Sequence, residues 1–234
     1  MMKKVSIIIP VYNEINHLEQ LITRVLKQDK INKQIIIVDD RSNDGTRELI
    51  KNKIEQLVDK VIYHEFNLGK GSAIQSAKPY IEGDIVIIQD GDLEYDPQDY
   101  EQLIYPIISK KSKVVYGSRV LGKQRYKLNN FTSIFRIFCN HMLTTFSNFI
   151  NNQNLTDSHT CYKVFDSHLF KNVNLVEKRF GFCPEITTKI ANRKINIFEV
   201  SITYLGREYS EGKKISFLDG IRAIYCLIKY KLVK

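Results

Sequence analysis

The stretch GDIVIIQDGDLEYDP, residues 83–97, decides how this chain is organised. Its apolar part, Ile85 to Ile88, is a short continuous run, which is the pattern of a strand buried on both faces. The stretch continues into four acids, at Asp90, Asp92, Glu94 and Asp96. Because clustered carboxylates repel one another, they indicate a bound cation. The C-terminal end of a buried strand is also where open α/β sheets bind their ligands.

Apolar runs on either side of this stretch predict further strands, at residues 5–10, 34–38, 61–63 and 114–116. Apolar residues at helical spacing lie between them. This alternation is typical of an α/β protein with a mostly parallel sheet flanked by helices. Residues 1–118 therefore look like a Rossmann-like nucleotide-binding half, although they contain neither G-x-G-x-x-G nor a Walker loop. The Gly69-Lys70-Gly71 turn fits either a phosphate contact or a tight turn before a helix.

The pattern changes after residue 118. We expect a polar, basic loop at 120–130 and an aromatic-rich helix at 134–150. A strand at 161–165, a helix at 184–191, a strand at 195–204 and a charged, glycine-rich loop at 206–214 follow. A single domain is predicted to cover residues 1–215, and an amphipathic helix the remaining residues 216–234. The aromatic-rich helix at 134–150 and the helix at 216–234 each fit either packing against the core or contact with a membrane surface.

The bulk composition limits the classes of protein that fit. The 234 residues suffice for one large domain, and the apolar runs are far shorter than the about 20 residues that cross a bilayer. Val5 to Val11 is too short for a signal-peptide core, so we expect a cytoplasmic protein, with peripheral contact at the inner face of the cell membrane left open. The net charge of +9 favours anionic partners. Nucleic acid is not expected, because no basic stripe with interleaved aromatics is present. The four cysteines show no metal-ligand spacing and are predicted to be reduced core residues.

Acids follow three of the predicted strands. Glu14 comes after the first, Asp39 and Asp40 end the second, and Asp90 with Asp92 follows the fourth. In a parallel sheet these residues reach the same edge. A divalent cation that holds a pyrophosphate would explain Asp90 and Asp92, and the other pair could accept hydrogen bonds from a base or ribose. Asp44 and Asp96 are instead predicted to cap helices, and Asn13 or Asn16 could cap the first helix.

Several motifs now carry a resemblance. IIPVYNE (8–14), VDDRSNDGT (38–46), NLGKG (67–71) and DGD (90–92) resemble family 2 glycosyltransferases of the GT-A fold. QDGDLEYDP (89–97), YGSR (116–119), TDSHTCYKVF (156–165) and GREYSEGKKI (206–215) are similar to the dolichol-phosphate mannose synthase branch and its bacterial polyprenyl-phosphate relatives. The motifs occur in the family's order over nearly the whole chain. The resemblance implies a nucleotide-sugar half at 1–118 and an acceptor half at 119–215.

The resemblance also implies a role for each matching residue. Asp92, Arg119 and Arg136 would be the catalytic residues, with Arg119 on phosphate near the reaction centre and Arg136 on the acceptor phosphate. Mg2+ or Mn2+ would be held by Asp90, Asp92 and Glu94, the last at a position where the synthases usually have glutamine. The nucleotide sugar would be bound by Pro10, Tyr12, Glu14, Asp39, Asp40, Asp90, Gly91, Arg207 and Lys214.

The implied activity is an inverting, metal-dependent transfer of a hexose, mannose or glucose, from a GDP- or UDP-sugar to polyprenyl or dolichyl phosphate. A phosphomonoester has a second pKa of about 6, so this acceptor arrives anionic and needs no general base. One alternative is a transferase that extends a polysaccharide or lipid oligosaccharide at a sugar hydroxyl, with Asp157 or Glu185 as the base. A non-catalytic subunit that binds nucleotide sugars is the alternative of another class. The oligomeric state is not predicted.

Overall fold

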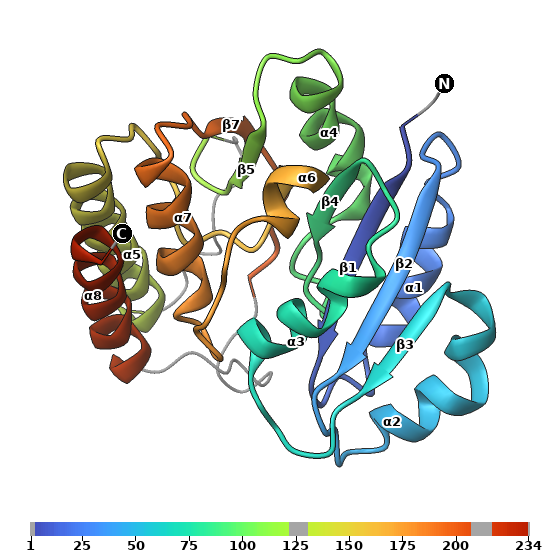
Figure 1. Ribbon diagram of the computed structural model, residues 1–234. Helices are drawn as coiled ribbons and strands as arrows, with labels where there is room; N and C mark the ends of the chain where they lie inside the picture. The colour runs from blue at the N-terminus through green and yellow to red at the C-terminus, as the bar shows by residue number, and fades with distance from the viewer. Residues whose placement is uncertain (1–2, 122–130, 207–216, 234) are drawn as a thin grey trace.

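The computed structural model describes residues 3–121, 131–206 and 217–233, with only the backbone described for 131–136 and 217 (Figure 1). Its centre is a seven-stranded sheet with the strand order β3-β2-β1-β4-β6-β5-β7. The strands are β1 (Val5–Val11), β2 (Lys33–Asp39), β3 (Lys60–Tyr63), β4 (Ile85–Ile88), β5 (Val114–Ser118), β6 (Lys163–Asp166) and β7 (Phe198–Ser201). This is the α/β fold that the alternation of strands and helices predicted.

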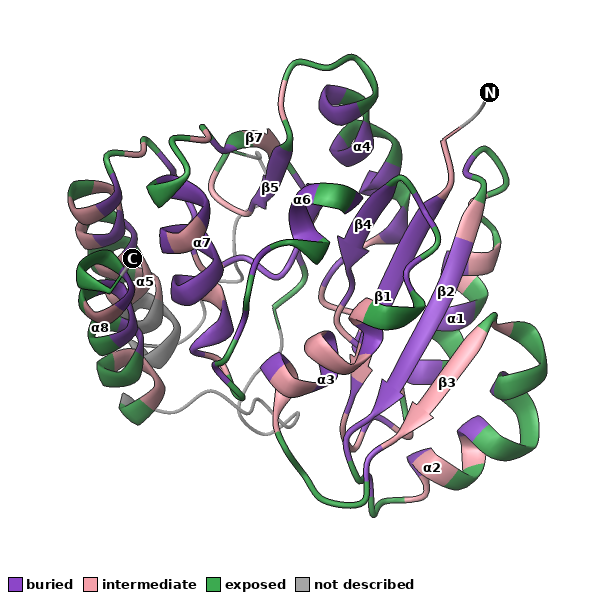
Figure 2. Ribbon diagram, in the orientation of Figure 1, coloured by how far each residue is buried: buried purple, intermediate pink, exposed green. Residues whose placement is uncertain are grey.

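The strands that precede the predicted site acids, β1, β2 and β4, are parallel to one another. Ile7 of β1 pairs with Ile35 of β2 on one side and with Ile87 of β4 on the other. These strands are fully buried in their apolar stretches (Figure 2), which agrees with runs that do not alternate in polarity. The ends of β1 and β2 are aligned, since Val11 pairs with Asp39, and β4 ends level with Ile8 of β1. Because the three strands are parallel, the loops that follow them emerge at one edge.

Helices cover both faces of this half. The helix α3 (Lys70–Ala77) packs on one face of β1 and β2, and α1 (Leu18–Leu26) lies on the opposite face (Figure 1). The remaining segments are α2 (Thr46–Leu49), a π-helix (Ile50–Ile54), 3-10 helices at 55–57, 78–80 and 97–99, α4 (Tyr100–Ile108) and α6 (Ser167–Lys171). Helices α5 (Phe131–Asn151), α7 (Phe182–Asn192) and α8 (Phe217–Leu232) pack side by side beyond β5.

The helix starts test the predicted caps. Asp96 is the N-cap of the helical turn at 97–99 and accepts a hydrogen bond from the Gln98 amide at 3.0 Å, so this prediction is confirmed. The predicted cap by Asp44 is wrong, because the N-cap of α2 is Gly45; Asp44, one residue earlier, accepts a hydrogen bond from the Thr46 amide at 3.0 Å. The predicted cap by Asn13 or Asn16 is wrong, because α1 begins later, at Leu18, and its N-cap His17 makes no capping side-chain bond. Asn13 instead takes a positive φ of 53° in the turn that leaves β1.

The second half departs most from a simple βαβ repeat. The strand β6 runs antiparallel between β4 and β5, and β5 then pairs in parallel with β7. This insertion brings the segment before β6, with Asp157 and Cys161, next to the end of β4. Among the described residues, no helix is both long enough and apolar enough to cross a bilayer.

Candidate active site

The acidic turn after β4 lies against the segment that leaves β1. A Cβ placed on Gly91 would be 3.3 Å from the carbonyl oxygen of Pro10 and 3.6 Å from Cγ of Glu14. Glu14 is buried, its amide donates to Thr46 Oγ1 at 2.9 Å, and its carboxylate lies 3.1 Å from Nδ1 of His17. The structure therefore brings the Asp-Gly-Asp turn and the 10–14 segment together at the carboxyl edge of the sheet.

Asp39 and Asp40 fasten the loops around this edge. Asp39 is fully buried and accepts hydrogen bonds from Arg47 Nε at 2.5 Å and from the Ser42 amide at 3.2 Å. Asp40 accepts from the amides of Leu68 and Gly69 at 2.8 and 2.7 Å. These bonds give both carboxylates structural partners. A contact of either with a nucleoside stays a prediction.

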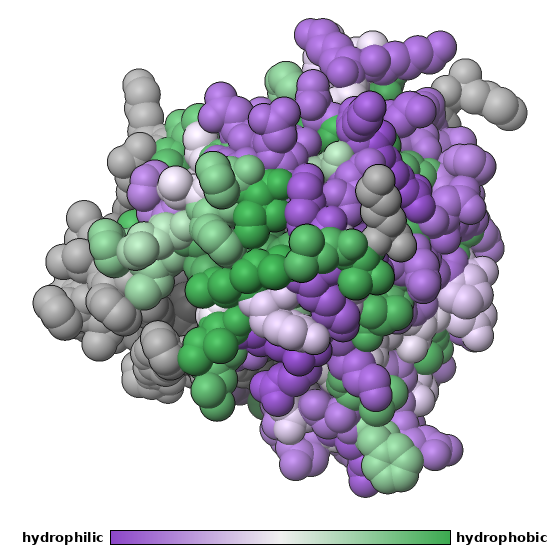
Figure 3. Space-filling model, turned by 60° about the vertical axis from the view of Figure 1, so that its left-hand side comes forward, coloured by the Kyte–Doolittle hydropathy of each residue, from purple (hydrophilic) through white to green (hydrophobic). Residues whose placement is uncertain are grey.

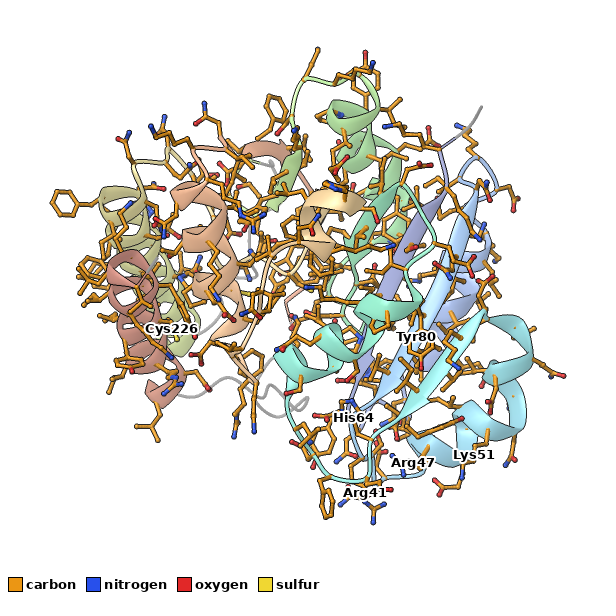
Figure 4. The ribbon with its side chains drawn as sticks, viewed as in Figure 1. Arg41, Arg47, Lys51, His64, Tyr80 and Cys226 are labelled. Carbon is orange, nitrogen blue, oxygen red and sulfur yellow. The ribbon has the colours of Figure 1, made fainter. Side chains whose placement is uncertain are left out.

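His64, the residue directly after β3, also binds Asp40. Its Nδ1 lies 2.7 Å from Asp40 Oδ1 and its Nε2 lies 2.9 Å from Ser76 Oγ. Figure 4 shows His64 close to Arg41 and Arg47 at the carboxyl ends of β2 and β3. Arg47 Nη2 donates to the His64 carbonyl at 2.6 Å. The loop after β2 is thereby tied to the glycine-rich turn that opens α3.

Lys70 from that turn reaches the acidic turn. Its ammonium forms an ion pair with Asp90 and lies 3.2 Å from Cys161 Sγ. Burial alone would lower the pKa of Lys70, but the charge of Asp90 raises it well above its ordinary value. Gly69, just before Lys70, has a φ of 91° and packs closely on the segment before α7, since a Cβ there would lie 2.6 Å from the Lys178 carbonyl oxygen. Lys70 therefore places a fixed positive charge in the site.

Asp92 and Glu94 are connected to a different part of the chain. The Glu94 amide donates to Asp92 Oδ1 at 3.1 Å, and Tyr204 Oη donates to Glu94 Oε2 at 2.9 Å. Asp92 is 7% exposed. Within the described ranges, no three His, Cys, Asp or Glu side chains are grouped as a metal site.

Arg119 follows β5 and pairs with Asp157 in a bidentate geometry. Arg119 Nε and Nη2 donate to the two carboxylate oxygens at 2.6 and 2.8 Å, and Asn140 adds a bond of 3.3 Å. Burial by itself raises the pKa of Asp157, but the charge and hydrogen bonds of Arg119 outweigh it and lower the pKa to about 2. The guanidinium also lies 5.2 Å from the centre of the Tyr204 ring. Its orientation is therefore fixed from two sides.

Glu199 and Lys163 hold the loop that carries Asp157. Glu199 of β7 accepts hydrogen bonds from the amides of Thr156 and Asp157 at 2.7 and 3.0 Å. Lys163 is fully buried and donates to the carbonyl groups of Ser158 and Thr160 at 2.9 and 2.8 Å. The position of Asp157, and through it that of Arg119, thus depends on strands β6 and β7.

Three predicted site residues cannot be placed in the same detail. Arg136 is on α5, and its side chain lies outside the described part of the structure. Arg207 and Lys214 lie in residues 207–216, also outside the described part. Glu185, considered above as a base, is fully buried in α7 and accepts hydrogen bonds from the amides of Val176 and Glu177.

A comparison with protein-family models decides the family. The model described as "Glycosyl transferase family 2" matches residues 6–173, well over half of the chain. The chain belongs to glycosyl transferase family 2. The matched range includes both the acidic turn and the Arg119–Asp157 pair.

Curated relatives in this family act on lipid phosphates, as their names state. An undecaprenyl-phosphate 4-deoxy-4-formamido-L-arabinose transferase of Proteus mirabilis (strain HI4320) is 29% identical over 230 residues, covering 96% of this chain and 67% of the relative. A UDP-N-acetylglucosamine–dolichyl-phosphate N-acetylglucosaminyltransferase of Methanococcus voltae is 29% identical over 250 residues, covering 99% of this chain and 98% of the relative.

Solved structures show the same GT-A architecture. Glucosyl-3-phosphoglycerate synthase from Mycobacterium tuberculosis, in complex with Mn2+, UDP and glucosyl-3-phosphoglycerate, superposes with a TM-score of 0.70 and 16% identity. That match covers 99% of this chain and 81% of the other. Mannosyl-3-phosphoglycerate synthase from Rubrobacter xylanophilus gives a TM-score of 0.71 at 17% identity, covering 97% and 72%. At these identities the likeness concerns the fold.

For this family 2 chain, sequence reasoning gave Lys70 too little weight. Its motif is only a lysine between two glycines, and a tight turn explains the glycines equally well. Nothing in the sequence signals the ion pair with Asp90, which lies twenty positions further along the chain. The same holds for Glu199, whose acceptor role toward Thr156 and Asp157 spans more than forty positions.

Proposed function

We propose that this chain transfers a sugar from a nucleotide sugar to polyprenyl phosphate with the aid of a divalent cation. The observation that carries the proposal is the edge of the sheet itself. The Asp90-Gly91-Asp92 turn packs against the segment after β1, with the Lys70 ammonium on one side. The names of the two relatives described above support a lipid phosphate as the acceptor. The donor is assigned to residues 1–118 and the acceptor to residues 119–215.

The two carboxylates of the acidic turn fit the cation. Mg2+ is usually held in proteins by one or two carboxylates together with phosphate oxygens of the substrate. Asp90 and Asp92 supply such a pair, and Mn2+ in a fold neighbour supports the same class of ion. When bound, the ion would neutralise charge on the nucleoside diphosphate as it leaves. Glu94, hydrogen-bonded to Tyr204, is assigned a supporting position as a third ligand.

The chain's own cations bind the anionic reactants. We assign Lys70, which pairs with Asp90, to the donor diphosphate, and Arg119, which is held by Asp157, to phosphate at the reaction centre. A phosphomonoester acceptor is already anionic at neutral pH, with a second pKa of about 6. It therefore needs cations to hold it in line with the anomeric carbon. No proton has to be removed from it.

The low pKa of Asp157 argues against the sugar-hydroxyl alternative. A general base works best with a pKa near the operating pH, whereas the pKa of Asp157 is lowered to about 2 and both its oxygens bind Arg119. Glu185 is buried among backbone amides and Lys189. Neither of the two bases considered for that reaction thus has the surroundings of a base.

A donor and acceptor screen tests the proposal. The protein is incubated with GDP- and UDP-sugars, including mannose, glucose and N-acetylglucosamine donors, and with polyprenyl phosphate, and formation of a lipid-linked sugar is followed. The finer prediction, a hexose such as mannose or glucose, stands if those donors give the fastest transfer. Transfer to a sugar hydroxyl in place of the lipid phosphate would support the first alternative. Binding of donor without transfer or hydrolysis would support the non-catalytic one.

Asp92→Asn is the matched test of the metal site. We expect it to abolish metal-dependent transfer with little loss of folding, because one anionic oxygen ligand is removed while the size of the side chain is kept. Asp96→Asn in the same loop is the control, since asparagine caps a helix as well as aspartate does. Full activity of the Asp92 variant in chelator-treated buffer would exclude the metal role.

A further inference from the structure

Helix α5 turns its polar side inward. The fully buried side chains among its described residues are Thr144, Ser147 and Asn151, all of them polar. Thr144 Oγ1 accepts from the Ser158 amide at 3.3 Å, and Asn151 donates to Thr188 at 3.2 Å. The opposite stripe carries large apolar residues: Phe138 and Met142, each 57% exposed, and Phe149, 86% exposed. A helix that only packed on a core would show the reverse arrangement.

Helix α8 continues this apolar surface. Its inward stripe, Ala223, Cys226, Leu227 and Tyr230, is buried against the rest of the molecule. On the opposite side of α8, residues that recur four and seven positions apart form a second stripe, which is exposed and also apolar. We call the exposed apolar side chains of both helices the α5–α8 face: Phe138, Met142, Phe149, Leu218, Ile221, Ile224, Tyr225, Ile228 and Leu232. Figure 3 turns the side of the molecule with these helices forward, and hydrophobic side chains gather in a band across it.

Basic residues border the α5–α8 face. At helical spacing, Arg222 and Lys229 lie along one margin of the exposed stripe of α8, and Lys231 lies along the other. Arg222 and Lys229 bond to Glu177 at 2.9 and 3.4 Å, which also anchors α8. Together α5 and α8 contain four Arg and Lys residues against one acid, Asp219. The face is thus apolar in its middle and positive at its borders.

The same helix connects this face to the candidate active site. Asn140, on the inward side of α5, donates to Asp157, which holds Arg119. The outward side of α5 lies across one helix diameter, about 10 Å. If the α5–α8 face rested on another surface, a phosphate group anchored in that surface would therefore lie near Arg119.

We propose that the α5–α8 face docks in the plane of an anionic lipid bilayer. Exposed apolar side chains would enter the boundary between headgroups and acyl chains. Anionic headgroups would face Lys231 on one border and, on the other, Arg222 and Lys229, whose two positive charges exceed the single charge of Glu177. The inference deepens the proposed function and rests on it only in the position of the acceptor, because polyprenyl phosphate is anchored in a bilayer. The face itself, with its composition and charge, is independent of that assignment.

Vesicle co-sedimentation, without any substrate, tests the proposal. The full chain is mixed with vesicles of phosphatidylcholine alone or of phosphatidylcholine with phosphatidylglycerol. We expect tighter binding to the anionic vesicles and weaker binding at high salt. The double variant Ile221→Ser and Ile228→Ser should bind about tenfold more weakly or worse, since each loses apolar surface that the bilayer would cover. Ile108→Ser at the end of α4 is the matched control, because Ile108 and Ile228 are each 44% exposed.

Two results of the vesicle experiment contradict the docking proposal. Equal binding to both kinds of vesicle, or equal binding of the double variant and the control, would overturn it. A chain that fails to bind vesicles and sediments as a dimer, which the double variant makes monomeric, would assign the face to a second copy. Circular dichroism shows whether the variants remain folded. Vesicle binding without sugar transfer would leave this inference standing and reject the proposed function, and transfer without vesicle binding would do the opposite.

Discussion

Asp157 forms a buried ion pair with Arg119. It is fully buried, and its two oxygens face the guanidinium of Arg119, itself 13% exposed in its side chain. A buried pair of this kind adds little stability over a hydrophobic pair, but removing one partner is costly because the other charge stays uncompensated. The residue is therefore a sensitive probe of the site.

Asp157→Asn should lower the free energy of unfolding by roughly 3 kcal/mol at neutral pH. The pKa of Asp157 is about 2 in the folded protein, against 3.8 for an aspartate without these interactions. The stability that the ionised carboxylate contributes is therefore fully present above about pH 4 and is lost as the pH falls to about 2. The difference between variant and wild type should shrink over that window. Urea unfolding at several pH values measures it. A loss of unfolding free energy that does not change with pH would contradict the ion pair. Asp29→Asn is the control, because Asp29 is exposed on the surface.

Lys70 offers a test of the donor side. Lys70→Met should weaken binding of a nucleoside diphosphate about tenfold or more, because a charge-assisted contact is removed while the side-chain length is kept. Lys70→Arg retains the charge and should lose less. Titration calorimetry measures both, with Lys30→Met, at a 79% exposed lysine, as the control. Unchanged affinity in Lys70→Met would remove Lys70 from the donor site.

At the scale of elements, α8 is fastened by one carboxylate. Glu177, in the loop before α7, receives Arg222, Lys229 and the Tyr230 hydroxyl, the last at 2.7 Å. Burial alone would raise the pKa of Glu177, but its hydrogen bonds with Tyr230 and Arg222 lower it. The carbonyl group of Glu177 also accepts from Gln75 of α3. The loop therefore connects the C-terminal helix with the helix that carries Lys70.

Glu177→Gln should loosen α8 without unfolding the sheet. Three donors lose an ionised acceptor, so we expect amide hydrogen exchange in α8 to speed up about tenfold or more, with little change in β1 and β2. Glu101→Gln is the control, because Glu101 pairs with Lys30 on the surface and such pairs contribute little. Acceleration spread evenly over the sheet and α8 would show a global effect instead.

At the scale of the whole molecule, the core beneath the candidate site is formed by the chain's own residues. Each apolar residue of β4 is fully buried, and the acidic turn is held by bonds within the chain. Metal and nucleoside diphosphate should then act as linked ligands that stabilise the folded state by mass action.

Mn2+ with a nucleoside diphosphate, each far above its Kd, should raise the Tm by about 5 °C or more. Asp92→Asn should lose this increment while its Tm without ligands stays near that of the wild type. Scanning calorimetry gives both values, and Asp96→Asn should behave as the wild type. An equal increment in the Asp92 variant would mean that the ion binds elsewhere.

The sequence by itself determined the local elements and the chemistry at their ends. Short continuous apolar runs flanked by turn residues favour strands buried on both faces, and in a parallel sheet the acids placed directly after such strands emerge at the same carboxyl edge. The strands β1, β2 and β4, the cap at Asp96 and the family follow from such local or ordered patterns.

The tertiary structure alone decided which partners these residues take. Asp40 binds the amides of the turn before α3, Lys70 pairs with Asp90, and β6 enters the sheet in antiparallel direction. Each involves segments far apart in the chain, so no local pattern encodes it. The direction of α5 is the clearest case. Its period predicts two stripes, but only the packed loop at 155–158, with polar groups to satisfy, turns the polar stripe inward and leaves the apolar one exposed.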